Sequence, residues 1–88
     1  MLFTASLFAQ TKVSGVVVDE KNEPIPFANV YFKNSSEGVI TNENGRFYLE
    51  SAKNHAVLIV SFISYTPKEV VLEKSVTYNL KVKLAEGE

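Results

Sequence analysis

The fold is decided by the stretch Val39-Ile-Thr-Asn-Glu-Asn-Gly-Arg-Phe-Tyr-Leu-Glu50, which reads as two short strands joined by a tight turn. The pair Asn44-Gly45 supplies the positive φ that such turns need. The side chain of Asn42 can accept a hydrogen bond from the backbone two residues later. Apolar and polar residues alternate after the turn, so Phe47 and Leu49 are expected to point inward. The stretch predicts a hairpin and an all-β fold.

The segment before this hairpin continues the pattern of β-rich runs and turns. Val13 to Val18 is a run broken by Gly15, which suggests a bulge or the close approach of another backbone. Residues 19–26 form a turn, in which Asn22 can adopt a left-handed conformation and two prolines fix the exit. Residues 28–33 then alternate between one buried and one solvated face.

The segment after the hairpin contains three more strands. Residues 56–65 are apolar on both faces, which predicts a doubly covered central strand. Pro67 breaks the ladder, and the charged run 68–73 is expected at a sheet edge. In the last strand, alternation predicts that four side chains point inward, namely Tyr78, Leu80, Val82 and Leu84. Seven short strands at this spacing predict a seven-stranded Greek-key β-sandwich of Ig-like type.

Composition excludes several classes of function. The 88 residues suffice for one domain with a modest core. The formal net charge of -1 provides no electrostatic footprint for nucleic acid. The chain has no cysteine, so disulfides, thiol nucleophiles and Cys-ligated zinc are excluded. A hydrophobic content of 45% indicates a globular chain.

The first ten residues differ from the rest because they are apolar and uncharged. They resemble the end of a signal peptide with cleavage after Ala9, although the basic n-region is missing. The alternative is a frayed apolar tail of a cytoplasmic protein. The stretch is too short to span a membrane, which takes about 20 apolar residues. We therefore expect a signal-peptide remnant at 1–10, the sandwich domain at 11–85 and a boundary or linker at 86–88.

Six motifs occur in an order that is specific in combination. They are Gly15-Val-Val-Val-Asp19, Glu23-Pro-Ile-Pro26, Ala28-Asn-Val30, Gly38-Val-Ile-Thr41, Glu43-Asn-Gly-Arg-Phe47 and Ser61-Phe-Ile-Ser-Tyr65. Together they resemble the carboxypeptidase-regulatory-like domain, which has a transthyretin-like (prealbumin-like) sandwich, over about residues 12–84. The residues that carry the turn and structural signature are Asp19, Pro24, Asn42, Gly45, Phe47 and Tyr65.

The chain departs from the family pattern at four positions. The family usually has Asp where Asn42 stands, and Gly where Asn22, Phe27 and Ser64 stand. Asn can still cap a turn, and it reaches left-handed φ at some cost. Ser64 is the least comfortable change, because a close backbone approach there would meet a side chain.

The resemblance implies a role without catalysis. In that family the domain accompanies metallocarboxypeptidases and sits at the N-terminus of TonB-dependent outer-membrane receptors. We expect an exported, periplasmic accessory domain that belongs to a larger parent chain and does not itself insert into the membrane. Two alternatives stay open: a free-standing carbohydrate- or peptide-binding module, and a regulatory domain beside a carboxypeptidase-type hydrolase.

The residue inventory supports no catalytic or metal site. His55 is the only histidine and lies in a predicted turn, so we expect an exposed loop residue rather than a ligand or base. No serine sits in a Gly-x-Ser-x-Gly elbow. The acidic residues lack the alternating pattern of a calcium loop. We predict no enzyme activity, no metal and no cofactor.

Aromatic residues are the best candidates for a contact surface. Alternation places Tyr31 and Tyr48 on outer faces, where an aromatic ring can stack on a sugar or join an interface. Tyr65 is expected to pack at a strand corner, with its hydroxyl bonded to the backbone. A carbohydrate or a peptide is therefore the ligand class that the sequence suggests.

Overall fold

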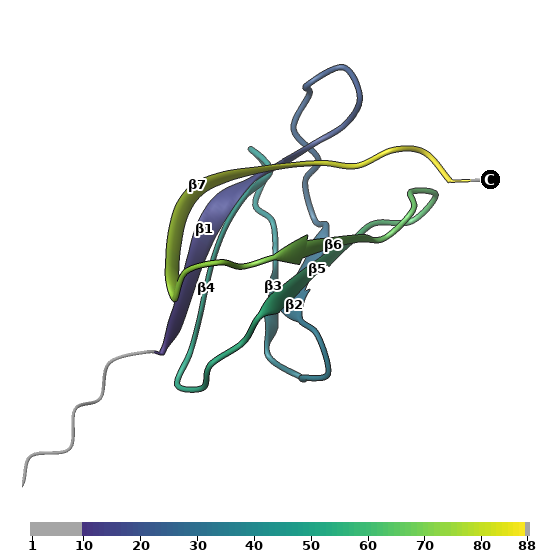
Figure 1. Ribbon diagram of the computed structural model, residues 1–88. Helices are drawn as coiled ribbons and strands as arrows, with labels where there is room; N and C mark the ends of the chain where they lie inside the picture. Colours follow the sequence, from purple (N-terminus) through teal and green to yellow (C-terminus); the bar gives the residue numbers. More distant parts are fainter. Residues whose placement is uncertain (1–9, 88) are drawn as a thin grey trace, which may run out of the picture.

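The computed structural model describes residues 10–87, and these form a sandwich of two β-sheets with no helix (Figure 1). One sheet has the strand order β4-β1-β7 and the other has the order β3-β2-β5-β6. The strands are β1 (Thr11–Val18), β2 (Asn29–Phe32), β3 (Gly38–Ile40), β4 (Arg46–Ser51), β5 (Val57–Ser61), β6 (Lys68–Val71) and β7 (Val76–Lys83). The predicted all-β sandwich is confirmed. The predicted signal-peptide remnant lies outside the described residues, apart from Gln10.

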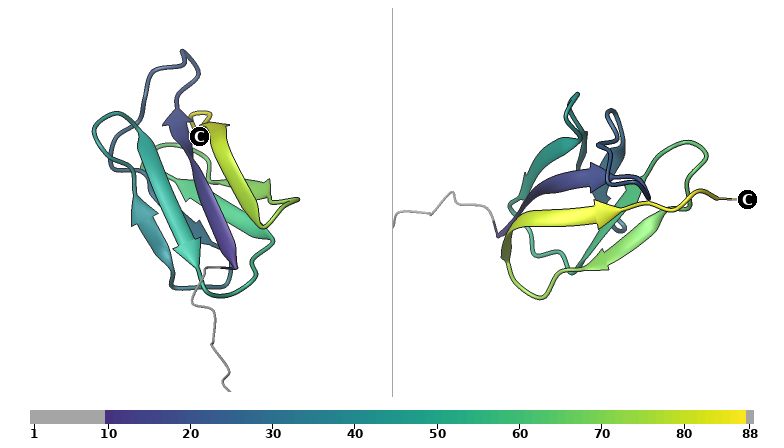
Figure 2. Two further views of the ribbon diagram at one scale, coloured as in Figure 1. Left: turned by 90° about the vertical axis from the view of Figure 1, so that its left-hand side faces the viewer. Right: turned by 90° about the horizontal axis from the view of Figure 1, so that it is seen from above.

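The core lies between the two sheets, which Figure 2 shows as two layers when seen from above. Alternate residues of β1, β4 and β5 point into it, as a period of two requires. Phe32 and Leu58 are its largest fully buried side chains. Phe47 and Leu49 are 6% and 5% exposed, which confirms the inward direction predicted for both.

Strand β1 is the middle of its sheet, and Gly15 allows β7 to approach it closely. A Cβ at this position would lie 2.1 Å from the carbonyl oxygen of Leu80. The register between β1 and β7 shifts at this point, between Val13 and Gly15. The bulge or close approach predicted from this glycine is therefore confirmed.

The predicted hairpin between β3 and β4 is wrong, although its turn is correct. Gly45 has φ 72°, and the Asn42 Oδ1 accepts hydrogen bonds from the backbone N–H groups of Asn44 and Arg46 at 2.9 and 3.0 Å. The two strands then enter different sheets. The chain diverges because β3, before the turn, pairs with β2, while β4, after the turn, pairs with β1.

Thr41 fixes this divergence from inside the sandwich. Its side chain is buried, and its Oγ1 donates a hydrogen bond to the carbonyl oxygen of Ile25 at 2.7 Å. The same Oγ1 accepts the backbone N–H of Ala28 at 2.9 Å. One hydroxyl thereby satisfies two buried backbone groups that would otherwise lack partners.

Strand β5 lies inside its sheet as predicted, but only one of its faces is fully covered. Leu58 and Val60 are completely buried, whereas Val57 and Ile59 on the outer face are half-buried. Beyond the strand, Ile63 is 78% exposed. The prediction that both faces of this strand are covered is therefore wrong, because its outer face is only partly buried although its residues are apolar. The charged strand β6 does lie at a sheet edge, as expected.

The three positions at which the family resemblance leads us to expect glycine all adopt positive φ here. Asn22, Phe27 and Ser64 have φ of 65°, 63° and 71°. Glycine adopts such angles without steric cost, and asparagine tolerates them better than phenylalanine or serine does. The left-handed turns are therefore formed here although none of the three residues is glycine.

Candidate functional site

His55 is a packed residue, which corrects the expectation of an exposed loop position. Its side chain is 13% exposed, and its ring stacks on the ring of Phe32 with centroids 4.2 Å apart and planes 4° apart. Phe32 is itself fully buried. The histidine thus closes one end of the hydrophobic core, which spacing in the sequence could not reveal.

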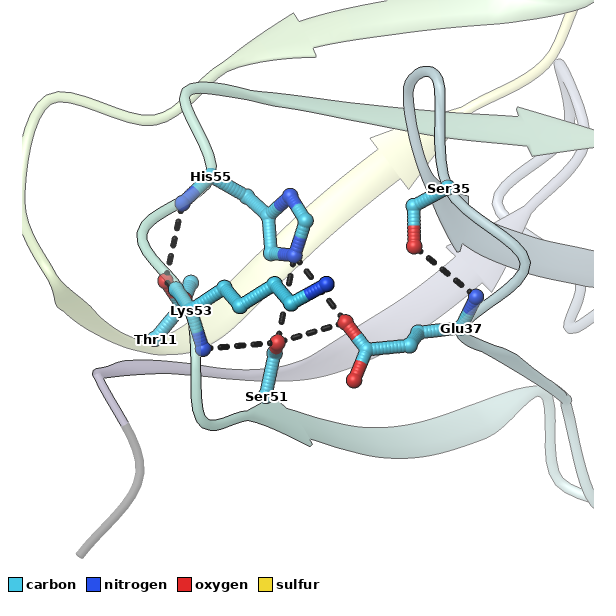
Figure 3. A network of polar contacts seen from close by, with 6 residues as sticks. All are labelled: Thr11, Ser35, Glu37, Ser51, Lys53 and His55. Carbon is cyan, nitrogen blue, oxygen red and sulfur yellow. Dashed lines mark hydrogen bonds and ion pairs between the residues drawn. The ribbon is translucent and has the colours of Figure 1, made fainter.

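The polar edge of the His55 ring joins two other side chains (Figure 3). Its Nε2 lies 3.0 Å from Oε1 of Glu37 and 3.1 Å from Oγ of Ser51. The Ser51 hydroxyl also donates to Glu37 Oε1 at 2.5 Å. Hydrogen bonds from Ser51 and then His55 lower the pKa of Glu37 below its ordinary value.

This Ser–His–Glu group is not a catalytic triad. A triad uses the two ring nitrogens separately, one toward the nucleophile and the other toward the orienting carboxylate. Here the same Nε2 contacts both Ser51 and Glu37, and the serine hydroxyl is already donated to the carboxylate. The arrangement leaves no base free to activate the serine.

Backbone contacts show that the cluster holds three segments together. The Thr11 Oγ1 donates to the carbonyl oxygen of Lys53 at 2.7 Å and accepts the N–H of His55 at 3.1 Å. The Lys53 N–H donates to Ser51 Oγ at 3.0 Å. The start of β1, the end of β4 and the loop leading to β5 therefore share one hydrogen-bonded network (Figure 3). We interpret this network as structural, because its hydrogen bonds stabilise the packing of the three segments against one another.

The acidic side chain of Asp19 caps a turn. The Asp19 Oδ1 accepts the backbone N–H groups of Lys21 and Glu23 at 2.8 and 2.9 Å. Within residues 10–87, no group of three or more His, Cys, Asp or Glu side chains could hold a metal ion. In the same part of the chain, no helix is long and apolar enough to cross a membrane.

The other signature residues also lie at turns and corners. Pro24 bridges to Val18 at the end of β1. Tyr65 is half-buried and packs against Phe62, with ring centroids 6.1 Å apart. Burial of its hydroxyl is the main cause that raises the pKa of Tyr65, and the negative charge of Asp19 is the next. The hydroxyl of Tyr65, which was expected to bond the backbone, makes no hydrogen bond to any residue between 10 and 87.

The two tyrosines proposed as contact residues lie on opposite sides of the molecule. Tyr48 is on the outer face of the β4-β1-β7 sheet and is 47% exposed. Tyr31 is on the outer face of the other sheet and is half-buried. Both outward directions match the alternation, but the two residues cannot form one surface.

Tyr78 is the aromatic residue that the sequence analysis placed wrongly. It was expected to point inward with Leu80 and Val82, yet it is 53% exposed. Asn79 has φ 61°. Two residues of β7, Tyr78 and Asn79, lie opposite the single residue Ser14 of β1, which makes a β-bulge. This bulge turns Tyr78 outward onto the face that carries Tyr48. The signal in the sequence is Asn79, because asparagine tolerates left-handed φ.

Comparison with known proteins gives matches over nearly the whole domain. The sequence profile of the CarboxypepD_reg-like domain matches residues 13–88. The TonB-dependent receptor SusC of Bacteroides thetaiotaomicron is 40% identical over 72 residues, which are 82% of this chain and 7% of that receptor. The TonB-dependent receptor P39 of Formosa agariphila is 32% identical over 78 residues, which are 89% of this chain and 8% of that receptor.

Solved structures support the fold. A chain from the crystal structure of a type II cohesin–X-dockerin complex of Acetivibrio cellulolyticus superposes with a TM-score of 0.71 at 14% identity. The match covers 88% of this chain and 58% of the other. That structure is of an N-terminal interface mutant of the complex. The structure of a C-terminal interface mutant of the same complex gives a TM-score of 0.67, also at 14% identity. At this identity the similarity concerns the fold alone.

Proposed function

Because this chain belongs to the CarboxypepD_reg-like domain family, we propose that it is a non-catalytic accessory domain of a TonB-dependent outer-membrane receptor, located on the periplasmic side as an N-terminal extension. The observation that carries the proposal is the 40% identity to SusC over 82% of this chain. The chain spans only 7–8% of the length of the two receptors that it matches. A small part of a much longer polypeptide is the arrangement expected of an accessory domain.

The geometry of the polar cluster supports the absence of catalysis. The single histidine is stacked on the core and bonded to Glu37, so it is not available as a general base. A regulatory domain beside a carboxypeptidase-type hydrolase is the alternative within the same family. The identity to receptors favours the receptor, since both curated relatives carry that name.

The test is the mass, peptide map and location of the native gene product. SusC, of which 72 residues are 7%, indicates a polypeptide of about 1,000 residues. We expect peptides of this domain in an outer-membrane product of that size, with Gln10 at its N-terminus. A protease should cut the domain only after the outer membrane is permeabilised. A product the size of one domain, or a hydrolase carrying it, would refute the proposal.

A further inference from the structure

The outer face of the β4-β1-β7 sheet carries two exposed tyrosines beside exposed cations. Figure 2, left, looks onto these three strands. Tyr48 on β4 is 47% exposed, and Tyr78 on β7 is 53% exposed. We call the surface formed by Tyr48, Ser14, Tyr78, Arg46 and Lys81 the tyrosine face.

The two tyrosines flank the short side chain of Ser14 on the middle strand. Ser14 is the register partner of Tyr48 on β4. On its other side it meets the bulge of β7, where the Asn79 N–H lies 3.4 Å from Ser14 Oγ. Neighbouring strands are about 4.8 Å apart, so the Tyr48 and Tyr78 backbones are separated by roughly 10 Å. The centre of the row is low because serine is small, which leaves both rings accessible from above.

The next row of the same face is positively charged. Val16 of β1 has Arg46 of β4 as its register partner on one side and Lys81 of β7 on the other. Both cations are exposed, and neither forms an ion pair within residues 10–87. The chain has a net charge of -1, so this positive row is a local feature and not a consequence of overall charge.

Tyr48 is also held in position by its own strand. Its hydroxyl donates to Oε2 of Glu50 at 2.5 Å, and this hydrogen bond is the main reason that its pKa is raised to about 12. Glu50 has Lys12 as its register partner, in the row on the opposite side of the tyrosines from Arg46. The ring is therefore tethered at its polar end, and Glu50 lies on the side of the tyrosine row that is opposite to Arg46 and Lys81.

We propose that the tyrosine face binds an acidic oligosaccharide, with sugar rings lying on Tyr48 and Tyr78 and the acidic groups directed to Arg46 and Lys81. Aromatic rings offer an apolar surface to the C–H face of a pyranose, and a guanidinium pairs with carboxylate or sulfate through two parallel hydrogen bonds. An open sheet face suits an extended polymer better than a small molecule, which prefers a cleft. This inference goes beyond the accessory role and concerns the domain in any parent chain.

The test is an NMR titration of the 88-residue chain, labelled with ¹⁵N, with a tetramer of galacturonic acid. Maltotetraose serves as the neutral sugar, and polyglutamate serves as the acidic polymer without sugar. We expect saturable shifts confined to β4, β1 and β7, tighter binding of the acidic sugar than of both controls, and weaker binding as salt is added.

Variants separate the two halves of the site. Tyr48→Ala and Tyr78→Ala should each weaken binding of the acidic tetramer about five- to tenfold. Arg46→Gln combined with Lys81→Gln should reduce it to the level of maltotetraose. Tyr31→Ala is the matched control, because this tyrosine lies on the opposite sheet and its loss should change nothing. A thermal unfolding curve establishes that each variant is folded.

Five outcomes would overturn the proposal, and four of them concern the sugars and the variants. These are no saturable binding at millimolar sugar, shifts centred on the other sheet, unchanged affinity in both tyrosine variants, and equal affinity for maltotetraose. Polyglutamate binding as tightly as the acidic tetramer would also overturn it, because the face would then recognise an acidic peptide and the sugar rings would contribute nothing.

Discussion

Ser64 keeps a backbone conformation that suits glycine better than serine. Its φ is 71°, its side chain is exposed, and its carbonyl oxygen accepts the Gly87 N–H at 3.0 Å. A left-handed L-residue costs about 1–2 kcal/mol, whereas glycine adds up to about 1 kcal/mol of unfolded-state entropy. Ser64→Gly should therefore raise the free energy of unfolding by roughly 0.5–1 kcal/mol, measured by urea denaturation.

The control for this prediction is Ser36→Gly. Ser36 is also exposed, but its φ is not positive, so the substitution brings only the entropic loss. The free energy of unfolding should fall slightly. If both variants shift stability in the same direction, the left-handed strain at Ser64 has no measurable consequence and the explanation is incorrect.

Glu37 should make stability depend on pH in the acid range. Its folded-state pKa lies below its ordinary value of 4.5, chiefly because the Ser51 hydroxyl donates to its carboxylate. A carboxylate with a lowered pKa stabilises the fold above its unfolded-state pKa, and this contribution is lost as pH falls through the folded-state pKa. In urea denaturation, the difference in stability between the native chain and Glu37→Gln should be largest near neutrality and shrink below about pH 4.5.

Glu43→Gln, in the exposed turn before β4, is the matched control. Its difference from the native chain should not show the same decline. A difference for Glu37→Gln that stays constant from pH 7 to pH 3 would mean that the hydrogen bonds to Ser51 and His55 do not favour the ionised carboxylate.

At the scale of the elements, Gly15 determines how closely β7 can lie against β1. Gly15→Ala would place a Cβ about 2.1 Å from the Leu80 carbonyl oxygen, which is backbone and cannot rotate away. Overpacking of this kind costs about 1–3 kcal/mol, and the backbone of Leu80 as the contacting group puts this site at the upper end. We expect a loss of roughly 3 kcal/mol in the free energy of unfolding, measured by urea denaturation.

The glycine at the other end of the domain provides a control. A Cβ at Gly87 would meet the Thr66 Oγ1 at 3.1 Å, and this side chain can rotate. Gly87→Ala should cost much less than Gly15→Ala. Equal losses in the two variants would show that the close approach of β7 to β1 is not the limiting contact.

Local pattern predicted individual elements well, but it could not identify their partners. The turn at Asn42 to Gly45 and the inward direction of Phe47 follow from residue type and alternation. The separation of β3 and β4 into two sheets depends on contacts made by Thr41 with residues distant in sequence, including Ile25. A hairpin was the simpler expectation because nothing in the turn itself encodes that divergence.

The candidate surface was predicted only in part for the same reason. The alternation placed Tyr48 outward correctly, but the bulge at Asn79 reversed the expected direction of Tyr78. One extra residue in a strand inverts the face of every side chain before it. The stacking of His55 on Phe32 was equally invisible, because the two residues are brought together by the fold.

At the scale of the whole molecule, the first and last strands depend on each other. Strands β1 and β7 pair in parallel, so the first and last strands of the domain lie side by side in one sheet (Figure 2). Removing β7 would leave β1 as an edge strand with unpaired backbone groups. It would also remove Val82 and the adjacent Leu84, which are 1% and 0% exposed, from the core.

A chain ending at Ser75 should therefore fail to fold. Burial of each of these two side chains contributes about 1.5–3 kcal/mol, and a small domain has only about 5–15 kcal/mol in total. Its ¹H–¹⁵N spectrum should show the narrow dispersion of an unfolded chain. A chain ending at Leu84 is the control, since it keeps β7 and loses the backbone contacts of residues 85–87 with residues 64–66. Dispersed amide signals from the shorter chain would show that the remaining strands form the core without the β1–β7 pairing, and that this pairing only extends the sheet.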